Sequence, residues 1–254
     1  MISEASDKKS WYHNWFNAPY YHLLYADRDE QEAAAFIDLL LKRLQPSAQS
    51  TMLDLACGRG RHSIHLAEHP YQVTGIDLSE ESIQEARSHE HEGLSFFVHD
   101  MRLPFRSNYF DYIFNFFTSF GYFDTRAEHV KTIGSIAEGL KKDGIFIMDY
   151  LNVHYVEKTL ESKTEVERDG VKFLVERWFD ETHFYKTIIV DDPANLEQPL
   201  TFEEKVAKFT LDDFKAMFTA SGLQIEEVYG DYSFGKYDTQ NSPRLIMKAR
   251  KTMP

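Results

Sequence analysis

The sequence has a single cysteine, no long apolar run and no excess of positive charge. Cys57 cannot form an internal disulfide, which agrees with a reducing compartment such as the cytoplasm. No segment reaches the about 18 consecutive apolar residues that a membrane-spanning helix needs. The N-terminus also lacks the basic and then apolar pattern of a signal peptide. We therefore expect a cytoplasmic protein that makes no membrane contact.

The charge balance is acidic throughout the chain. The 254 residues include 41 acidic and 28 basic side chains, which gives a formal net charge of −13. Proteins that bind nucleic acid normally present a basic face to the phosphates. The balance argues against broad contact with nucleic acid and leaves only a local RNA-binding groove open.

Short apolar segments alternate with helical patterns in the first half of the chain. The expected strands are 51–56, 71–76, 94–98, 110–115 and 144–150, and the expected helices are 60–68, 79–89 and 125–140. Strands that alternate with helices in this way form a parallel sheet with right-handed crossovers. The sequence therefore predicts an α/β fold.

The flanking segments behave differently, and we interpret residues 1–254 as one domain with additions to a core. Residues 1–46 are expected to form a helical N-terminal lid, and residues 152–209 a small antiparallel β insertion with a turn at 168–170. The core then comprises residues 50–151 and 210–254. In its last part a helix begins at Thr210 and ends at Gly222, and strands follow at 223–229 and 244–250.

The most informative run is Thr51–Gly60, in which an apolar strand meets a glycine-rich turn and then a helix. Gly58 and Gly60 carry no Cβ, so the backbone can turn sharply there and approach a ligand. The next strand ends in Asp77, where an acid can accept hydrogen bonds from both hydroxyls of a ribose. Together these features predict a cofactor that contains a nucleoside.

The charges around the turn distinguish between cofactors. A dinucleotide favours Gly-x-Gly-x-x-Gly, whereas the turn here reads Gly58-Arg-Gly-Arg-His-Ser63 and lacks the third glycine. Asp54, just before the turn, would repel a pyrophosphate. S-adenosylmethionine has no phosphate and carries a cationic ammonium and sulfonium, so an acid is favourable beside it. The turn thus counts against a nicotinamide oxidoreductase.

The pattern Asp54-x-Ala56-x-Gly58-x-Gly60 resembles motif I of the class I S-adenosylmethionine-dependent methyltransferases. The resemblance continues, in the order and roughly the spacing of that family, at Gly75–Ser79, His99–Arg102, Phe110–Asn115 and Leu140–Asp149. It implies a Rossmann-like seven-stranded sheet that closes with an antiparallel hairpin. It also implies methyl transfer from S-adenosylmethionine, with S-adenosylhomocysteine as product.

The same resemblance assigns residues to the cofactor. The backbone at Ala56 and Gly58 would face the methionine part, and Asp77 would hold the ribose. Leu78 would pack on the purine, while Asp100 and Met101 would meet the adenine. The full set of expected cofactor-binding residues is Asp54, Ala56, Gly58, Gly60, Asp77, Leu78, Asp100, Met101 and Asn115.

The substrate side is less specific. Candidate substrate contacts follow the fourth and fifth core strands or come from the N-terminal lid: Tyr122, Asn152, His154, Tyr20, Tyr21 and Arg28. Displacement at a sulfonium carbon depends mainly on alignment, and a base is needed only when the nucleophile arrives protonated. No catalytic residue is assigned from the sequence.

We expect methylation of nitrogen or oxygen on a small molecule. The alternatives are an RNA- or protein-directed methyltransferase, or a nucleotide-binding protein that has this fold without the activity. The Asn/Asp-Pro-Pro-Tyr/Phe block of amino-methylating DNA enzymes is absent, as is a Pro-Cys nucleophile. The dispersed histidines and the lone Cys57 show no metal-ligand spacing, so no metal site is expected. The oligomeric state does not follow from the sequence.

Overall fold

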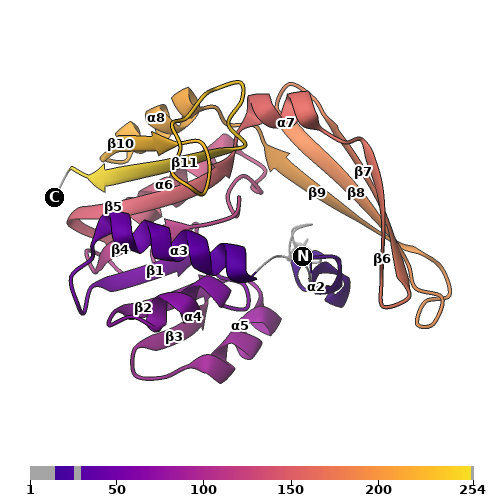
Figure 1. Ribbon diagram of the computed structural model, residues 1–254, viewed down its shortest axis with the longest axis horizontal. Helices are drawn as coiled ribbons and strands as arrows, with labels where there is room; N and C mark the ends of the chain where they lie inside the picture. The colour runs from indigo at the N-terminus through magenta and orange to yellow at the C-terminus, as the bar shows by residue number, and fades with distance from the viewer. Residues whose placement is uncertain (1–14, 26–29, 253–254) are drawn as a thin grey trace, which may run out of the picture.

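The computed structural model describes residues 15–25 and 30–252, and within them it contains two separate β-sheets (Figure 1). The larger sheet has seven strands in the order β10-β11-β5-β4-β1-β2-β3, and the smaller has four in the order β6-β7-β8-β9. The strands of the larger sheet are β1 (Thr51–Leu55), β2 (Gln72–Asp77), β3 (Leu94–Val98), β4 (Phe110–Asn115), β5 (Leu140–Leu151), β10 (Leu223–Tyr229) and β11 (Arg244–Lys251).

The larger sheet is parallel except at one edge. Strand β1 lies between β2 and β4 and pairs with both in parallel, whereas β11 runs antiparallel to β5 and to β10. This confirms the predicted seven-stranded sheet with a closing antiparallel hairpin. Because the strand order reverses at β1, a ligand site is expected beyond the carboxyl ends of β1 and its neighbours.

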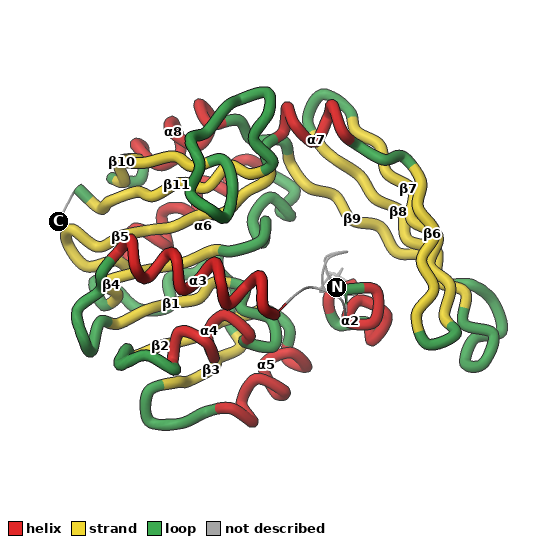
Figure 2. The backbone as a smooth tube through the Cα atoms, in the orientation of Figure 1, coloured by secondary structure: helices red, strands yellow, loops and turns green. Residues whose placement is uncertain are grey.

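Helices cover both faces of this sheet. Helices α3 (Glu30–Leu44), α4 (Arg61–Ala67) and α5 (Glu80–Ala86) share one apolar cluster with the strands, and α6 (Arg126–Gly139) and α8 (Leu211–Ala220) share another. In Figure 2, α3 crosses in front of the strands. Ile113 and Phe114, adjacent on β4, point into opposite clusters, as the period of a strand requires.

Within the described ranges, no helix is long and apolar enough to cross a membrane.

Three elements differ from the sequence expectation. Strand β5 begins at Leu140 rather than at residue 144, because Leu140 already pairs with Phe110 before the register shifts. A short helix, α7 (Val153–Thr159), occupies the start of the region expected to be an antiparallel insertion. The 3₁₀ turn at Arg87–His89 continues α5, so the helix expected over 79–89 is α-helical only to Ala86.

The smaller sheet confirms the predicted antiparallel insertion. Its strands are β6 (Lys163–Arg168), β7 (Val171–Phe179), β8 (His183–Asp191) and β9 (Leu200–Ala207). The predicted turn at 168–170 joins β6 to β7, with Asp169 and Gly170 both at positive φ as a tight hairpin turn needs. Figure 1 shows this sheet standing beside the larger one, with helix α2 (Pro19–Leu24) between them.

A buried carboxylate fastens the N-terminal segment (residues 15–25) to the smaller sheet. One oxygen of Glu204 accepts hydrogen bonds from Trp15 Nε1 at 2.7 Å and from the Tyr25 hydroxyl at 2.9 Å. Its other oxygen lies 2.6 Å from Lys186 Nζ. Burial raises the pKa of Glu204, but Lys186 and the hydrogen bonds outweigh it and lower the pKa overall. The ionised Glu204 therefore holds the segment where it can cover the larger sheet.

Replacing Glu204→Gln should destabilise the protein by about 2 kcal/mol, because it leaves the half-buried Lys186 without its countercharge. Urea unfolding followed by tryptophan fluorescence and circular dichroism would measure the loss. Since the folded pKa of Glu204 lies below its ordinary 4.5, the difference from wild type should be full above that pH and shrink as the pH falls below it.

The matched control is Glu176→Gln. Glu176 pairs with Lys163 on the same sheet at 3.8 Å, but both side chains are about half exposed. Exposed pairs contribute little, so this variant should change the stability by less than about 0.5 kcal/mol. Equal losses in the two variants would contradict the role given to Glu204.

Candidate active site

A cavity of about 360 Å³ opens beyond the carboxyl ends of β1, β2 and β4. Its walls come from the glycine-rich turn, from the loops after β2, β3 and β4, and from the N-terminal segment. Of the residues expected to bind cofactor or substrate, it brings together Asp54, Ala56, Gly58, Asp77, Leu78, Asp100, Met101, Tyr21 and Tyr122. These nine residues therefore lie around one continuous cavity, and their binding roles stay a prediction.

The turn after β1 is left-handed at three positions. Ala56, Gly58 and Gly60 have φ values of 57°, 56° and 85°. A Cβ on Gly58 would meet no atom within 4 Å, so the space beside this backbone is open to the cavity. A Cβ on Gly60 would lie 2.6 Å from the ring of Phe96. Gly60 therefore permits close packing inside the protein, which corrects the expectation that both glycines approach a ligand.

Asp77 joins the turn to the end of β2. Its Oδ2 accepts a hydrogen bond from the Gly58 amide and its Oδ1 accepts one from the Ser79 amide, both at 2.8 Å. Each carboxylate oxygen has room for a further donor, so the group can still accept hydrogen bonds from a ligand in the cavity. Burial raises the pKa of Asp77 above its usual value.

Asp54 lies beneath the turn and is almost fully buried, with an exposed fraction of 1%. Its Oδ2 accepts a hydrogen bond from the Ser63 hydroxyl at 2.7 Å. Burial raises the pKa of Asp54 to about 7, because the Ser63 hydrogen bond and the more distant Arg61 offset only part of the loss of hydration. A cation that entered the cavity would favour the ionised form of this acid.

Asp100 is fixed by a neighbouring arginine. Arg102 Nη2 lies 2.7 Å from Asp100 Oδ2, and Arg102 Nη1 reaches Glu128 Oε1 at 2.6 Å. Burial alone would raise the pKa of Asp100, but the hydrogen bonds and charge of Arg102 lower it overall. The cavity wall beside Met101 therefore carries a carboxylate that remains ionised.

A second strained loop lies after β4, and its strain was not predicted from the sequence. Phe117 and Thr118 have φ values of 56° and 61°. Asp149 Oδ2 accepts a hydrogen bond from the Phe117 amide at 2.8 Å, and Arg244 donates to Thr118 Oγ1 at 2.8 Å. Asp149 and Arg244 also pair with each other at 2.7 Å. This buried ion pair fixes a loop that lines the cavity, and its partners are too far apart in the sequence to be recognised there.

Aromatic side chains of the N-terminal segment form the cover of the cavity. Phe16 packs edge-on against Tyr122 and Tyr21, with ring centroids 5.3 and 5.1 Å apart. The Ser79 hydroxyl, at the end of β2, donates to Asn17 Oδ1 at 2.6 Å. The N-terminal segment thus contacts both the loop after β2 and the loop after β4. Phe16, Asn17 and His22 also line the cavity, although the sequence did not single them out.

Several expected site residues lie elsewhere. The Tyr20 hydroxyl donates to Asp192 Oδ2 at 2.9 Å, on the smaller sheet. Asn152 Nδ2 donates to the Ser242 carbonyl at 2.8 Å and so holds the loop before β11. Both side chains already serve the packing of the fold, and neither lines the cavity.

The remaining expected residues are also outside the cavity wall. Asn115 is buried at the end of β4, and its Nδ2 donates to the Leu55 carbonyl at 3.2 Å, across to β1. His154 lies on α7 and is not among the residues around the cavity. Arg28 falls outside the described residues.

The donor set suits a cationic nucleoside better than a phosphate. Two acids, the buried Asp54 and the partly buried Asp77, lie beside the turn, and the position that a Cβ of Gly58 would fill is open. A pyrophosphate would be repelled by both carboxylates, whereas ribose hydroxyls and an ammonium group would be attracted. The residues present therefore fit S-adenosylmethionine.

Comparisons with known proteins agree with this chemistry. A family model described as a methyltransferase domain matches residues 46–182. The dTDP-3-amino-3,4,6-trideoxy-alpha-D-glucopyranose N,N-dimethyltransferase of Streptomyces venezuelae is 28% identical over 228 residues, which cover 84% of this chain and 92% of that protein.

Two solved structures show the same fold. An S-adenosylmethionine-dependent methyltransferase from Clostridium acetobutylicum aligns with a TM-score of 0.75 at 21% identity, over 91% of this chain and 95% of that one. CalS10 from Micromonospora echinaspora, an amino pentose methyltransferase solved with S-adenosylmethionine bound, aligns with a TM-score of 0.69 at 21% identity, over 92% and 98% of the two chains. From its matched domain, its sheet order and its turn, this chain belongs to the class I S-adenosylmethionine-dependent methyltransferases.

Proposed function

We propose that this protein binds S-adenosylmethionine in the cavity and transfers its methyl group to an amino group of a small sugar nucleotide. The observation that carries the proposal is the open space beside Gly58, flanked by Asp77 and covered by the aromatic N-terminal segment. When bound, the cofactor supplies a methyl group on a sulfonium, which is a good leaving group. The protein's own task is then to hold, orient and enclose the reactants.

The cofactor would be held by residues that already have fixed positions. Asp77 would accept the ribose hydroxyls, and the backbone at Ala56 and Gly58 would lie along the methionine part. Asp54 would face its ammonium group. Leu78, Asp100 and Met101 would surround the adenine, as the family resemblance implies.

The substrate class is argued from the walls of the cavity and from the relatives. Arg59 and Arg61 line the cavity together with aromatic rings, a combination that suits a diphosphate joined to a sugar. The Streptomyces relative acts on the amino group of a dTDP-linked sugar, as its name states. His22, His62 and His99 also line the cavity, and imidazole is a side chain whose ordinary pKa suits it to accept a proton from an ammonium substrate.

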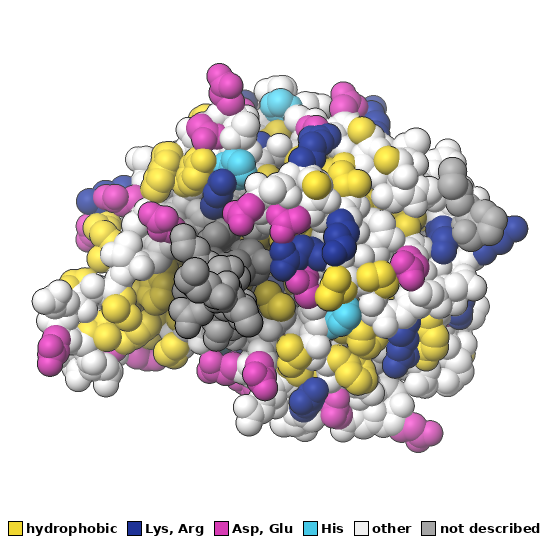
Figure 3. Space-filling model, turned by 180° about the vertical axis from the view of Figure 1, so that it is seen from behind, with side chains coloured by type: hydrophobic (Ala, Val, Ile, Leu, Met, Phe, Trp, Pro, Cys, Tyr) yellow, Lys and Arg dark blue, Asp and Glu magenta, His cyan; other side chains and the backbone are white. Residues whose placement is uncertain are grey.

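RNA- or protein-directed methylation has less support. The net charge is −13, and on the face shown in Figure 3 basic and acidic side chains are interspersed rather than gathered by sign. A phosphate backbone requires a larger basic surface. Methylation of oxygen instead of nitrogen is the alternative within the proposal, and cytoplasmic location stays a prediction.

The test is a mass-spectrometric methyl-transfer assay with S-adenosylmethionine and a panel of acceptors. The panel contains dTDP-linked amino sugars, the matching hydroxyl sugars, a tRNA pool and a peptide pool. We expect a gain of one or two methyl groups on the amino sugars alone. Transfer only to hydroxyl sugars would move the reaction to oxygen, and transfer only to tRNA or peptide would overturn the substrate class. Cofactor binding with no transfer to any member would contradict the assigned reaction.

Gly58→Ala should weaken binding of S-adenosylmethionine by about 10- to 100-fold, because the added methyl group enters the space proposed for the cofactor. Isothermal titration calorimetry measures this directly. The matched control is Gly170→Ala, since Gly170 also has a positive φ and open space around its Cβ position but lies in the β6–β7 turn. Both variants should lose about 1 kcal/mol of stability from backbone strain. Equal affinities in the two variants would place the cofactor elsewhere.

Binding of S-adenosylmethionine should release a proton near pH 7 and strengthen as the pH rises through that value. Asp54 has a pKa of about 7 in the free protein, and a nearby ammonium would lower it. Calorimetry at pH 7 in buffers of different ionisation enthalpy gives the number of protons released.

Asp54→Asn is the control and should bind without this proton release. If wild type releases no more protons than the variant, Asp54 does not lie against the ammonium group of the cofactor.

In the free protein the raised pKa of Asp54 makes the pH dependence of folding stability opposite to that of cofactor binding. The contribution of protonated Asp54 to stability is full below its ordinary pKa of 3.8 and is lost as the pH rises to about 7.

A further inference from the structure

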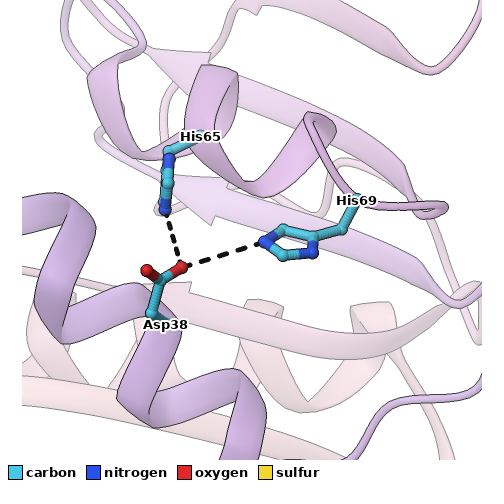
Figure 4. Close-up of side chains that lie close together, drawn as sticks. All are labelled: Asp38, His65 and His69. Atoms are coloured by element: carbon cyan, nitrogen blue, oxygen red, sulfur yellow. Dashed lines mark hydrogen bonds and ion pairs between the residues drawn. The ribbon is translucent and has the colours of Figure 1, made fainter.

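A cluster of one carboxylate and two imidazoles lies outside the cavity, between α3 and the end of α4 (Figure 4). Asp38 belongs to α3, His65 to α4, and His69 follows just after α4 ends. Asp38 Oδ1 lies 2.9 Å from His65 Nε2 and 3.9 Å from His69 Nε2. One ligand atom from each residue lies within 4.8 Å of the other two. A metal site here was not expected, since the histidines are dispersed in the sequence and show no metal-ligand spacing with Cys57.

His65 has a carboxylate oxygen against each of its ring nitrogens. Its Nε2 faces Asp38 Oδ1 and its Nδ1 faces Glu68 Oε2, both at 2.9 Å. A neutral imidazole has a single N–H, so it can donate to only one of these oxygens. The other contact sets a lone pair against a carboxylate unless a cation occupies it. That cation is either a second proton on the ring or a metal ion held by His65 and Asp38.

The arrangement of the groups favours a metal. In a tetrahedral zinc site with bonds of about 2.0–2.1 Å, neighbouring ligand atoms stand about 3.3 Å apart. Asp38 Oδ1 lies 2.9 Å from His65 Nε2 and 3.9 Å from His69 Nε2, one distance shorter and one longer than that spacing. His65 lies on α4 and His69 just after its end, and the centroids of their rings are 6.0 Å apart. Ligating histidines commonly donate their other ring N–H to a carboxylate, the position that Glu68 occupies toward His65.

We propose that Asp38, His65 and His69 bind a divalent transition-metal ion, with Zn²⁺ as the probe, and that Glu68 orients His65 through its Nδ1–H. The side chains of His65, His69 and Asp38 are 21%, 39% and 49% exposed, so water can complete the coordination. The ligands are nitrogen and carboxylate oxygen, which suit zinc, nickel or cobalt better than calcium.

The ion would act on the structure and not on the methyl transfer. It would join α3, which follows the N-terminal segment in the chain, to α4, which begins at the glycine-rich turn. Arg61 and His62, in the first turn of α4, line the cavity, while His65 and His69 lie toward its other end. A bound ion should therefore stabilise the packing of the two helices. This inference does not depend on the proposed substrate.

The test is calorimetric titration of the chelator-treated, full-length protein with Zn²⁺, in the absence of cofactor. We expect one ion per chain in the micromolar range or tighter. His65→Gln and His69→Gln should each weaken binding by about 100-fold, and Glu68→Gln by about tenfold. His89→Gln is the matched control, because His89 is an exposed histidine on the 3₁₀ turn after α5. This variant should bind Zn²⁺ with the same affinity as wild type.

A second measurement keeps the result independent of folding defects. Zn²⁺ should raise the melting temperature of wild type and of His89→Gln, and leave that of the double variant His65→Gln/His69→Gln unchanged. If the double variant binds Zn²⁺ as tightly as wild type, the ion sits elsewhere and the proposal is overturned. It is also overturned if wild type binds no Zn²⁺.

Discussion

The carboxylate of Asp77 connects the parts of the site that must stay together. By accepting from the amides of Gly58 and Ser79, it joins the turn after β1 to the end of β2, where the strand order reverses. The Ser79 hydroxyl in turn donates to Asn17, so the N-terminal segment that covers the cavity is attached at the end of β2 as well. A backbone amide left without this acceptor would cost about 1–3 kcal/mol. The open space beside Gly58 exists because the turn is held in this way.

Local features of the sequence were sufficient for the core of the fold. The apolar strands before Asp54 and Asp77 and the cap at Thr210 each depend on neighbours within a few residues, and the structure has them where expected. The same holds for the hairpin turn at Gly170. The cavity likewise gathers residues from the first three motif blocks, because the carboxyl ends of parallel strands meet at one edge.

Features that depend on long-range pairing could not be predicted. Asn152 follows β5 at the expected edge, yet its amide is used by the loop before β11, and no local pattern indicates this. The loop at Phe117 and Thr118 is fixed by Asp149 and Arg244, which are brought together only when β11 pairs with β5. Glu204 and Trp15 likewise lie far apart in the sequence and meet only in the folded chain, as do Asp38 and His65. In each case a polar side chain finds its partner in a distant part of the sequence.

The site keeps several groups in states that folding alone would not favour. Asp54 is buried with a pKa near 7, and Ala56, Phe117 and Thr118 occupy the left-handed region without being glycine. Each such residue costs about 1–2 kcal/mol, and such strain persists where the surrounding structure imposes it, often at functional sites. Ala56, Phe117 and Thr118 all line one cavity, and the buried acid there would be stabilised in its ionised form by a cation. A cationic cofactor bound there would therefore stabilise the conformation that the rest of the chain imposes, and its binding would be coupled to the stability of the fold through Asp54 and the turn above it.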